Sequence, residues 1–413
     1  MALQRPLLIK LLAPLLAFAA TLAVIAHMNG SPGSGALSPS RAASADALAA
    51  RGDTLLQKVR ETGDPRNYVA AEAAFRRALT EDSHNAAALA GMGSLALGRH
   101  DFRGGLTYVR RARAEAPEIV RFYGVEVDAL VELGRYGEAE RVLQRMVDLK
   151  PNLSSYARVS YFRELHGDLD GAAEAMRLAV SAGGDAPENV AYVQTLLGNL
   201  ELDRGRTAAA ERSYRLALAR FPRYAAARAG LARVAVARGE LDLAIRRYRS
   251  LVTVLPLPDY VIALGEAELV AGRGADARQD FGLVRIERRL YEQSGVNLDL
   301  ELALFEADHG SAARGLAFAR QAWKSAPSVR SADALGWALT RAGQPAAGLE
   351  YGRRALRLGS RDPLFLYHAG MSARAAGNDR LGRRYLSSSL SLNPRFSPLR
   401  APRAQRALRA LEG

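Results

Sequence analysis

Small, aromatic and apolar positions recur at a fixed interval in the middle of the chain, between residues 197 and 256. Each of these positions is followed by the same residue type 34 residues later. The matching pairs are Gly205 and Gly239, Ala210 and Ala244, Tyr214 and Tyr248, and Pro222 and Pro256. A fixed repeat of this length is typical of helix–turn–helix units that stack, because one helix pair cannot bury its apolar face alone. The segment therefore predicts two adjacent helix pairs of the same build.

The same pattern continues on both sides of this segment. Turn residues recur 33 to 38 residues apart, at Gly63, Gly98, Gly134, Gly167, Gly205, Gly239, Gly272, Gly310, Gly343 and Gly377. In the second unit, the register favours His100 over Gly98 as the turn residue. A small residue also recurs early in the second helix, at Gly105, Ala139, Ala172, Ala210, Ala244, Ala277, Gly315, Gly348 and Gly382. A large side chain there would hold the two helices apart, so the pattern predicts closely packed pairs.

These residues resemble the tetratricopeptide-repeat (TPR) family, whose period is also 34 residues. The positions that carry the resemblance are Leu197-Gly198, the turn residue Gly205, the aromatic Tyr214 and the terminal Pro222. The resemblance covers residues 46–395. It implies an all-α, right-handed α-solenoid of about ten helix-turn-helix units, whose first helices line a concave groove.

The resemblance also implies which side chains face the groove. As the partner-binding groove we expect Tyr192, Asn199, Asp203, Asp259, Glu266, Asp308, Trp337 and Tyr367. The same register places Tyr161, Glu164, Arg233, Arg330 and Asp333 in the groove. Aromatic residues are common anchors at protein interfaces, although they are also ordinary packing residues. The sequence therefore predicts a groove that carries carboxylates and aromatic rings.

The segment 299–308 is acidic and contains neither lysine nor arginine. In one interpretation, its carboxylates form ion pairs with Arg314 and Arg320 of the next helix, or with arginines elsewhere. In the other, Asp308 joins Glu266 in an acidic groove patch that binds a basic peptide or a cation. A metal site at Asp308 and His309 is disfavoured, because one histidine on mixed helix faces gives poor ligand geometry.

The first 45 residues differ in composition from the repeats. Residues 1–28 contain Arg5 and Lys10 ahead of an apolar run, which is typical of an export signal. Residues 7–26 are just long enough to span a bilayer, so this segment is either a cleaved signal or a retained transmembrane anchor. Residues 29–45 read as a flexible linker. We expect a bacterial, exported protein that is membrane-anchored and faces outside the cytoplasm, or is secreted or periplasmic if the signal is cleaved.

The formal net charge of +14 is uneven, with nine arginines and only two acidic residues in positions 363–413. Residues 396–413 form either a helix that caps the array or a basic tail. The tail arginines are Arg400, Arg403, Arg406 and Arg409. Because the charge gathers at one end and not in a stripe along the array, nucleic acid is not the expected partner.

No cysteine is present, and no motif for a phosphate loop, a dinucleotide fingerprint, a zinc protease or a nucleophile elbow occurs. We therefore expect no catalytic residues, no metal and no cofactor. The expected function is a non-catalytic scaffold that binds a protein or peptide in its concave groove. The alternative is a basic, envelope-associated module that binds an anionic polymer or lipid through its C-terminal arginines.

Overall fold

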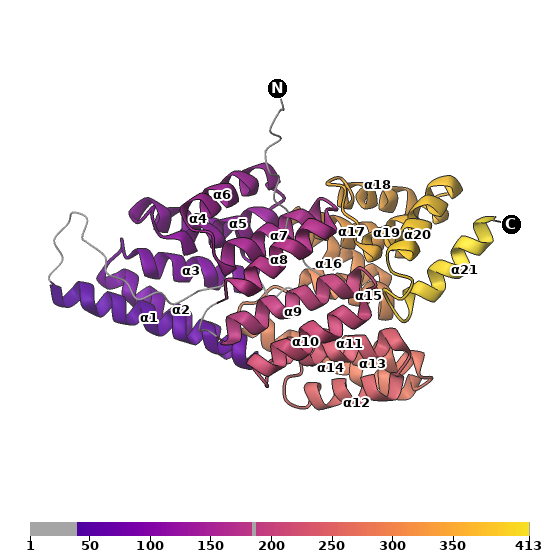
Figure 1. Ribbon diagram of the computed structural model, residues 1–413, viewed down its shortest axis with the longest axis horizontal. Coiled ribbons are helices and arrows are strands. Elements are labelled where there is room, and N and C mark those ends of the chain that lie inside the picture. The colour runs from indigo at the N-terminus through magenta and orange to yellow at the C-terminus, as the bar shows by residue number, and fades with distance from the viewer. Residues whose placement is uncertain (1–38, 184–186, 413) are drawn as a thin grey trace, which may run out of the picture. The chain divides into compact units, whose positions relative to one another are not determined.

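The computed structural model describes residues 39–183 and 187–412 (Figure 1). These residues form 21 α-helices and no strand. The helices follow one another as ten pairs, from α1 with α2 to α19 with α20, and α21 follows the last pair. The predicted all-α class and the repeated stacking of about ten helix pairs are confirmed. The right-handed sense of the array stays a prediction.

The described chain divides into two compact units. The N-terminal unit contains residues 39–154 and 285–298, and the C-terminal unit contains residues 155–183, 187–284 and 299–412. The helices of the N-terminal unit are α1 (Pro39–Thr62), α2 (Arg66–Glu81), α3 (Ala86–Gly98), α4 (Phe102–Glu115), α5 (Val120–Glu132) and α6 (Tyr136–Leu149). The helices that lie wholly or mainly in the C-terminal unit are α7 (Leu153–Leu165), α8 (Leu169–Ser181), α9 (Pro187–Asp203), α10 (Thr207–Arg220), α11 (Ala225–Arg238), α12 (Leu241–Val252), α13 (Pro258–Val270), α15 (Asp299–His309), α16 (Ala312–Ser325), α17 (Val329–Arg341), α18 (Pro345–Ala355), α19 (Pro363–Ala375), α20 (Asp379–Leu392) and α21 (Arg400–Glu412). Helix α14 (Gly274–Gln293) has residues in both units.

The repeated aromatic and small positions pack together within and between helix pairs. Tyr214 and Ala210 of α10 are fully buried. The ring of Tyr214 lies against Gly198 of α9 and Gly230 of α11, and a Cβ atom built on Gly198 would be 2.5 Å from that ring. Because this distance is shorter than an ordinary carbon–carbon contact, a side chain at Gly198 would displace the ring. The repeated glycine thus makes room for the repeated aromatic residue.

Most of the predicted turn residues adopt the left-handed backbone that favours glycine. Positive φ angles occur at Gly63, Gly134, Gly167, Gly205, Gly239, Gly272, Gly343 and Gly377. In the second unit His100, and not Gly98, has a positive φ of 61°, as the register predicted. The His100 ring Nδ1 lies 2.6 Å from the backbone oxygen of Asn297, and the ring stacks on Phe102. These contacts hold a non-glycine residue in a conformation that such residues seldom adopt.

One of the two longest turn spacings, 38 residues from Gly272 to Gly310, includes extra residues around 287–297. These residues lengthen a helix and do not form an exposed loop. Helix α14 continues to Gln293, and Tyr291 near its end is 3% exposed. The Tyr291 hydroxyl donates to the backbone oxygen of Gly63 at 3.3 Å, and the Asn297 amide donates to the backbone oxygen of Arg99 at 3.1 Å. The extension is therefore part of the core of the N-terminal unit and not a tolerated surface insertion.

The first helix begins earlier than expected. Helix α1 starts at Pro39, whereas the linker was predicted to run to residue 45. The stretch from Ser40 is rich in alanine, a strong helix former, which accounts for the earlier start. The predicted signal or anchor at residues 7–26 and the linker up to residue 38 lie outside the described residues and stay predictions. Among the described helices, none combines the length and the apolar character that a membrane span needs.

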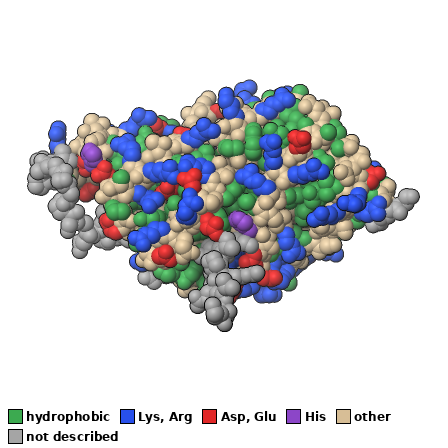
Figure 2. All heavy atoms as spheres, turned by 90° about the horizontal axis from the view of Figure 1, so that it is seen from above, with side chains coloured by type: hydrophobic (Ala, Val, Ile, Leu, Met, Phe, Trp, Pro, Cys, Tyr) green, Lys and Arg blue, Asp and Glu red, His purple; other side chains and the backbone are tan. Residues whose placement is uncertain are grey.

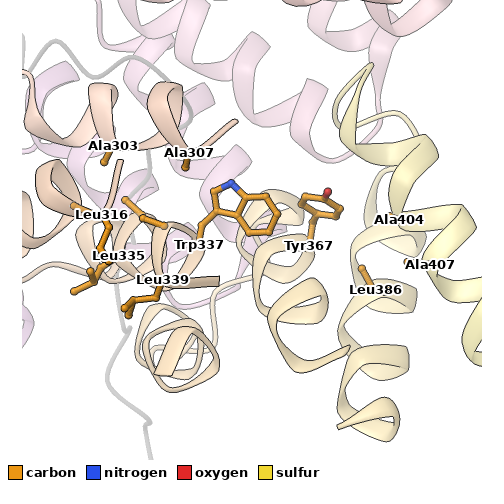
Figure 3. Packing of buried hydrophobic residues seen from close by; sticks show 13 residues of the cluster. Ala303, Ala307, Leu316, Leu335, Trp337, Leu339, Tyr367, Leu386, Ala404 and Ala407 are labelled. Atoms are coloured by element: carbon orange, nitrogen blue, oxygen red, sulfur yellow. The ribbon is translucent and has the colours of Figure 1, made fainter. Parts of the chain in front are cut away.

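The C-terminal unit has a core that reaches its last helix (Figure 3). Trp337 of α17 lies beside Tyr367 of α19, with ring centroids 5.7 Å apart. Ala404 and Ala407 of α21 belong to the same buried cluster. Helix α21 therefore packs on the end of the array as a capping helix, which is one of the two predicted roles of this segment.

Candidate functional site

The C-terminal unit encloses a cavity of about 280 Å³ that is lined mainly by the first helices of successive pairs. Helices α7, α9, α11, α13, α15, α17 and α19 all contribute residues, and the chain before α21 contributes residues 393 and 395–398. Apolar walls come from residues such as Leu202, Ile262 and Leu304. This volume is close to the lower end of the usual range for ligand pockets.

The array closes on itself around this cavity. The loop at Gly167, after α7, approaches the loop at Gly359, before α19, so closely that a Cβ atom on Gly167 would collide with the Gly359 carbonyl oxygen. The side-chain amide of Asn393 donates to the Leu202 carbonyl oxygen at 2.8 Å. Arg395 donates to the Ala237 carbonyl oxygen at 3.3 Å. Residues more than 150 positions apart are therefore joined across the open side of the array.

One wall of the cavity holds a buried ion-pair network that includes the capping helix. The Arg400 guanidinium of α21 lies 3.0 Å from Glu266 Oε1 of α13 and also pairs with Asp308 of α15. The side chains of Arg400, Glu266 and Asp308 are 14%, 13% and 4% exposed. His309 Nε2 lies 2.9 Å from Glu266 Oε1, and the indole N–H of Trp337 donates to Asp308 Oδ1 at 3.0 Å. Two carboxylates thus share one guanidinium.

The pKa values of these two carboxylates reflect the arginine. Burial alone would raise the pKa of Asp308, but the charges of Arg400, His368 and His309 and the hydrogen bond from Arg400 together outweigh burial and lower that pKa to about 2. Burial likewise opposes the charges of Arg400 and His309 at Glu266, whose pKa is lowered on balance. Both groups are therefore ionised at neutral pH.

Other carboxylates that line the cavity have raised pKa values, because no arginine fully offsets the cost of burying their charge. Glu164 at the end of α7 is 7% exposed, and its Oε2 has no hydrogen-bond partner among the described residues. Burial, followed by the charges of Asp203 and Asp362, raises the pKa of Glu164 well above its ordinary value. Asp203 accepts a hydrogen bond from Arg233 at 2.9 Å, yet burial still raises its pKa. The charge repulsion among these carboxylates is thus only partly relieved.

Asp362 gives the cavity a pH dependence that can be tested. Its side chain accepts hydrogen bonds from the Leu364 and Phe365 amides as the N-cap of α19, while burial and the nearby Asp203 and Asp333 carboxylates raise its pKa to about 7. The native state therefore keeps a proton that the unfolded chain loses near pH 4. As a result, Asp362 destabilises the fold progressively as the pH rises from about 4 to about 7.

Replacing Asp362 with asparagine should remove this dependence, because asparagine caps a helix as well as aspartate does and does not titrate. The stability of Asp362→Asn relative to the unsubstituted protein should rise across this window by at most about 1.4 kcal/mol per pH unit. Urea unfolding at pH 4.5, 6 and 7.5 measures the difference. A constant difference across the three pH values would contradict the raised pKa.

Family models identify the repeats directly. Two models described as tetratricopeptide repeat match the chain, one over residues 90–154 and the other over residues 201–264. The chain belongs to the TPR superfamily. The TPR period of 34 residues and the packing around Tyr214 are the sequence and structural expressions of that membership.

Several solved structures are similar to this TPR chain. TTC0263, a thermophilic TPR protein of Thermus thermophilus, is 24% identical, with 44% of this chain and 98% of that chain covered at a TM-score of 0.39. The human IFIT1 dimer with m7Gppp-AAAA is 17% identical, with 84% and 71% covered at a TM-score of 0.40. Yeast Tom70 is 11% identical, with 89% and 95% covered at a TM-score of 0.36. The comparison with curated proteins gives no significant match.

The residues expected in the groove fall into two groups in the TPR structure. Four of the eight line the cavity, namely Asp203, Asp259, Glu266 and Asp308. The other four, Tyr192, Asn199, Trp337 and Tyr367, are not among its lining residues. Asn199 contacts a residue that lines the cavity, because its side-chain oxygen accepts a hydrogen bond from Arg233 at 3.1 Å. The same oxygen accepts a hydrogen bond from the Tyr214 hydroxyl at 2.7 Å.

The two aromatic anchors belong to the core. Trp337 is 4% exposed and Tyr367 is 1% exposed, and the His368 ring stacks on Trp337 at 4.5 Å. Neither aromatic ring offers surface to a partner in this structure, because Trp337 packs on the rings of α19 and Tyr367 also packs on Phe396 of the chain before α21. The indole N–H of Trp337 donates a hydrogen bond to Asp308, which lines the cavity.

Each of the two interpretations of the acidic segment 299–308 accounts for some of its carboxylates. Glu306 accepts from Arg314 at 2.9 Å, as the ion-pair interpretation proposed, and Asp308 pairs with the distant Arg400. Glu301 instead lines the cavity, and its Oε2 has no hydrogen-bond partner in the described part of the chain. His309 faces Glu266 and stacks on Phe281, and the described residues contain no group of three or more metal-ligating side chains.

The basic end also differs from the prediction. Arg400 turns into the cavity, so it does not belong to one exposed cluster with Arg403, Arg406 and Arg409, which are exposed on α21. On the face drawn in Figure 2, lysine and arginine side chains are scattered among apolar and acidic ones. Sequence reasoning missed Arg400 and Asp362 as site residues, because neither lies on the inner face of a predicted first helix.

Proposed function

We propose that this TPR protein is a non-catalytic scaffold that binds a segment of a partner protein in the cavity of its C-terminal unit. TPR repeats form a protein-interaction fold, and the first helices of seven successive pairs converge on this one cavity. That convergence is the observation on which the proposal rests. The small volume favours a partner that inserts one or two side chains, with the rest of its segment on the rim.

The proposal includes a location. The apolar segment 7–26 would carry the array across a membrane and, if retained, hold it on the far side. The structure of that segment lies outside the described residues, so the support for export is its sequence alone.

Site-specific photo-crosslinking tests the binding surface. A photoreactive residue at Ala263, which lines the cavity, is compared with one at Ala208, which is exposed on α10 of the same unit. We expect a defined partner peptide to crosslink at position 263 and not at position 208. The purified partner should then bind the unsubstituted protein at least tenfold more tightly than an Ala263→Trp variant, in which the cavity is filled. Equal crosslinking at both positions would reject the cavity as the binding site.

Two measurements distinguish the alternative function from the proposed one: the salt dependence of binding and the substitution of the exposed arginines. An anionic polymer or lipid held by Arg403, Arg406 and Arg409 would lose affinity steeply between low and moderate salt. It would also lose affinity when all three are replaced with glutamine. A partner that crosslinks at position 263 should be indifferent to this triple substitution, and loss of its binding would favour the alternative.

A further inference from the structure

The cavity is lined by more acidic than basic side chains, in contrast to the chain as a whole. Although the protein carries a net charge of +14, the cavity is lined by eight carboxylates and four arginines. The carboxylates are Glu164, Asp203, Asp259, Glu266, Glu301, Asp308, Asp333 and Asp362, and the arginines are Arg233, Arg330, Arg395 and Arg400. Such an excess of one sign in an enclosed space attracts ligands of the other sign.

Several carboxylates of the cavity each keep one buried oxygen without a hydrogen-bond partner among the described residues. Oδ2 of Asp203 and Oδ1 of Asp333 are buried without hydrogen-bond partners among the described residues, as is Oε2 of Glu164. Glu164 and Asp333 are only 7% and 2% exposed. A buried carboxylate oxygen without a partner is costly, and proteins seldom retain one without a use for it. Burial raises the pKa of both Glu164 and Asp203, and at Glu164 the charges of Asp203 and Asp362 raise the pKa further.

One organic cation, an arginine of the chain itself, already pairs with two carboxylates of this cavity. The Arg400 guanidinium of α21 lines the cavity and bridges Glu266 and Asp308, which come from different helices. A planar guanidinium has several N–H donors and can contact two carboxylates at once. A metal ion is a poorer candidate, because the described residues bring no three metal-ligating groups together.

We infer that the cavity is a binding site for an organic cation, whose guanidinium or ammonium group is held by Glu164, Asp203 and Asp362. The inference rests on the proposed function and adds to it the chemistry of the ligand. The cavity volume of about 280 Å³ is large enough for one arginine-sized group. The cation comes either from an arginine or lysine side chain of the partner segment or from a free small molecule.

Isothermal titration calorimetry with three probes tests this site. The probes are an N-acetylated, C-amidated Gly-Arg-Gly peptide, its citrulline analogue, and agmatine as a free guanidinium compound. We expect at least one of the two cationic probes to bind, and the citrulline peptide, which has the same shape without the charge, to bind at least tenfold more weakly. Equal affinity for the arginine and citrulline peptides, or no binding of either cationic probe, would overturn the inference.

Variants assign the site within the cavity. Glu164→Gln and Asp362→Asn should each weaken binding of the cation at least tenfold, whereas Glu174→Gln, at a 72% exposed side chain on α8, should leave it unchanged. Melting curves exclude a folding defect: Glu164→Gln removes the charge of a buried carboxylate that has an unpaired oxygen, and Asp362→Asn keeps a helix-capping side chain, so neither should lower the melting temperature. Binding that survives both cavity substitutions would refute the assignment.

A second readout distinguishes binding from a structural role. A cation beside Glu164 lowers the pKa of this carboxyl, so binding releases a proton, and the observed enthalpy should depend on the ionisation enthalpy of the buffer. This dependence should be smaller in Glu164→Gln. If agmatine binds and the peptide does not, the inference stands and the proposed protein partner fails. If a partner without basic residues crosslinks at position 263 and no cation binds, the proposed function stands and the inference fails.

Discussion

Replacing Arg400 with alanine is expected to destabilise the C-terminal unit by about 3–5 kcal/mol, the usual cost of removing one partner from a buried ion pair. The substitution leaves Glu266 and Asp308 buried with one guanidinium fewer, and burial then raises both pKa values instead of Arg400 lowering them. It also detaches the first turn of α21 from α13 and α15. The capping helix should therefore loosen along with the network.

The effect of Arg400→Ala should depend on pH with a sign that follows from the lowered pKa of Asp308. A carboxyl whose pKa falls on folding contributes stability above its unfolded pKa, near 3.8, and that stability is lost as the pH falls toward about 2. The difference between the variant and the unsubstituted protein should thus be largest near neutral pH and should shrink below pH 4.

Urea unfolding followed by circular dichroism measures this loss, and limited proteolysis reports whether α21 opens. Arg406→Ala is the matched control, because Arg406 lies on the same helix with its side chain exposed. The control should change stability by no more than about 0.5 kcal/mol. If Arg400→Ala and Arg406→Ala lose the same small amount, the ion-pair network does not hold α21 in place.

The position of Arg400 also illustrates what the sequence could and could not predict. The helix pairs, their turns and their small positions follow from spacing alone, because each repeat contacts only its neighbours. His100 was found at the turn by register even though it is not glycine. In contrast, the pairing of Arg400 with Glu266 joins residues 134 positions apart. No local spacing encodes such a contact.

The same distinction explains the mixed result at the candidate site. Asp203, Asp259, Glu266 and Asp308 were placed by their register on first helices, and all four line the cavity. Trp337 shares that register but is buried, because the rings of Tyr367 and His368 on α19 pack against it. Register predicts the direction in which a side chain points. Which residues that side chain contacts depends on packing between distant repeats, and the repeat pattern does not determine that packing.

The second large effect is expected at Gly348 on α18, one of the small positions of the repeat. A Cβ atom there would lie 2.6 Å from the Gly336 carbonyl oxygen on α17 and would collide with the Thr340 hydroxyl. The hydroxyl can rotate away, but the carbonyl belongs to a helix backbone, so the two helices must separate. Gly348→Ala should therefore cost about 1–3 kcal/mol, the usual range for overpacking, even though alanine is the better helix former.

Gly282 on α14 is the matched control for this substitution. It lies in the same unit and within a helix, and a Cβ atom built on it meets no atom within 4 Å. Gly282→Ala should therefore stabilise the protein by about 0.5–1 kcal/mol, because only the helix propensity changes. Thermal and urea unfolding of the two alanine variants compares the same chemical change with opposite expected signs. Stabilisation by both would mean that the paired helices of α17 and α18 tolerate separation, and that the small positions of this TPR array are not set by helix contact.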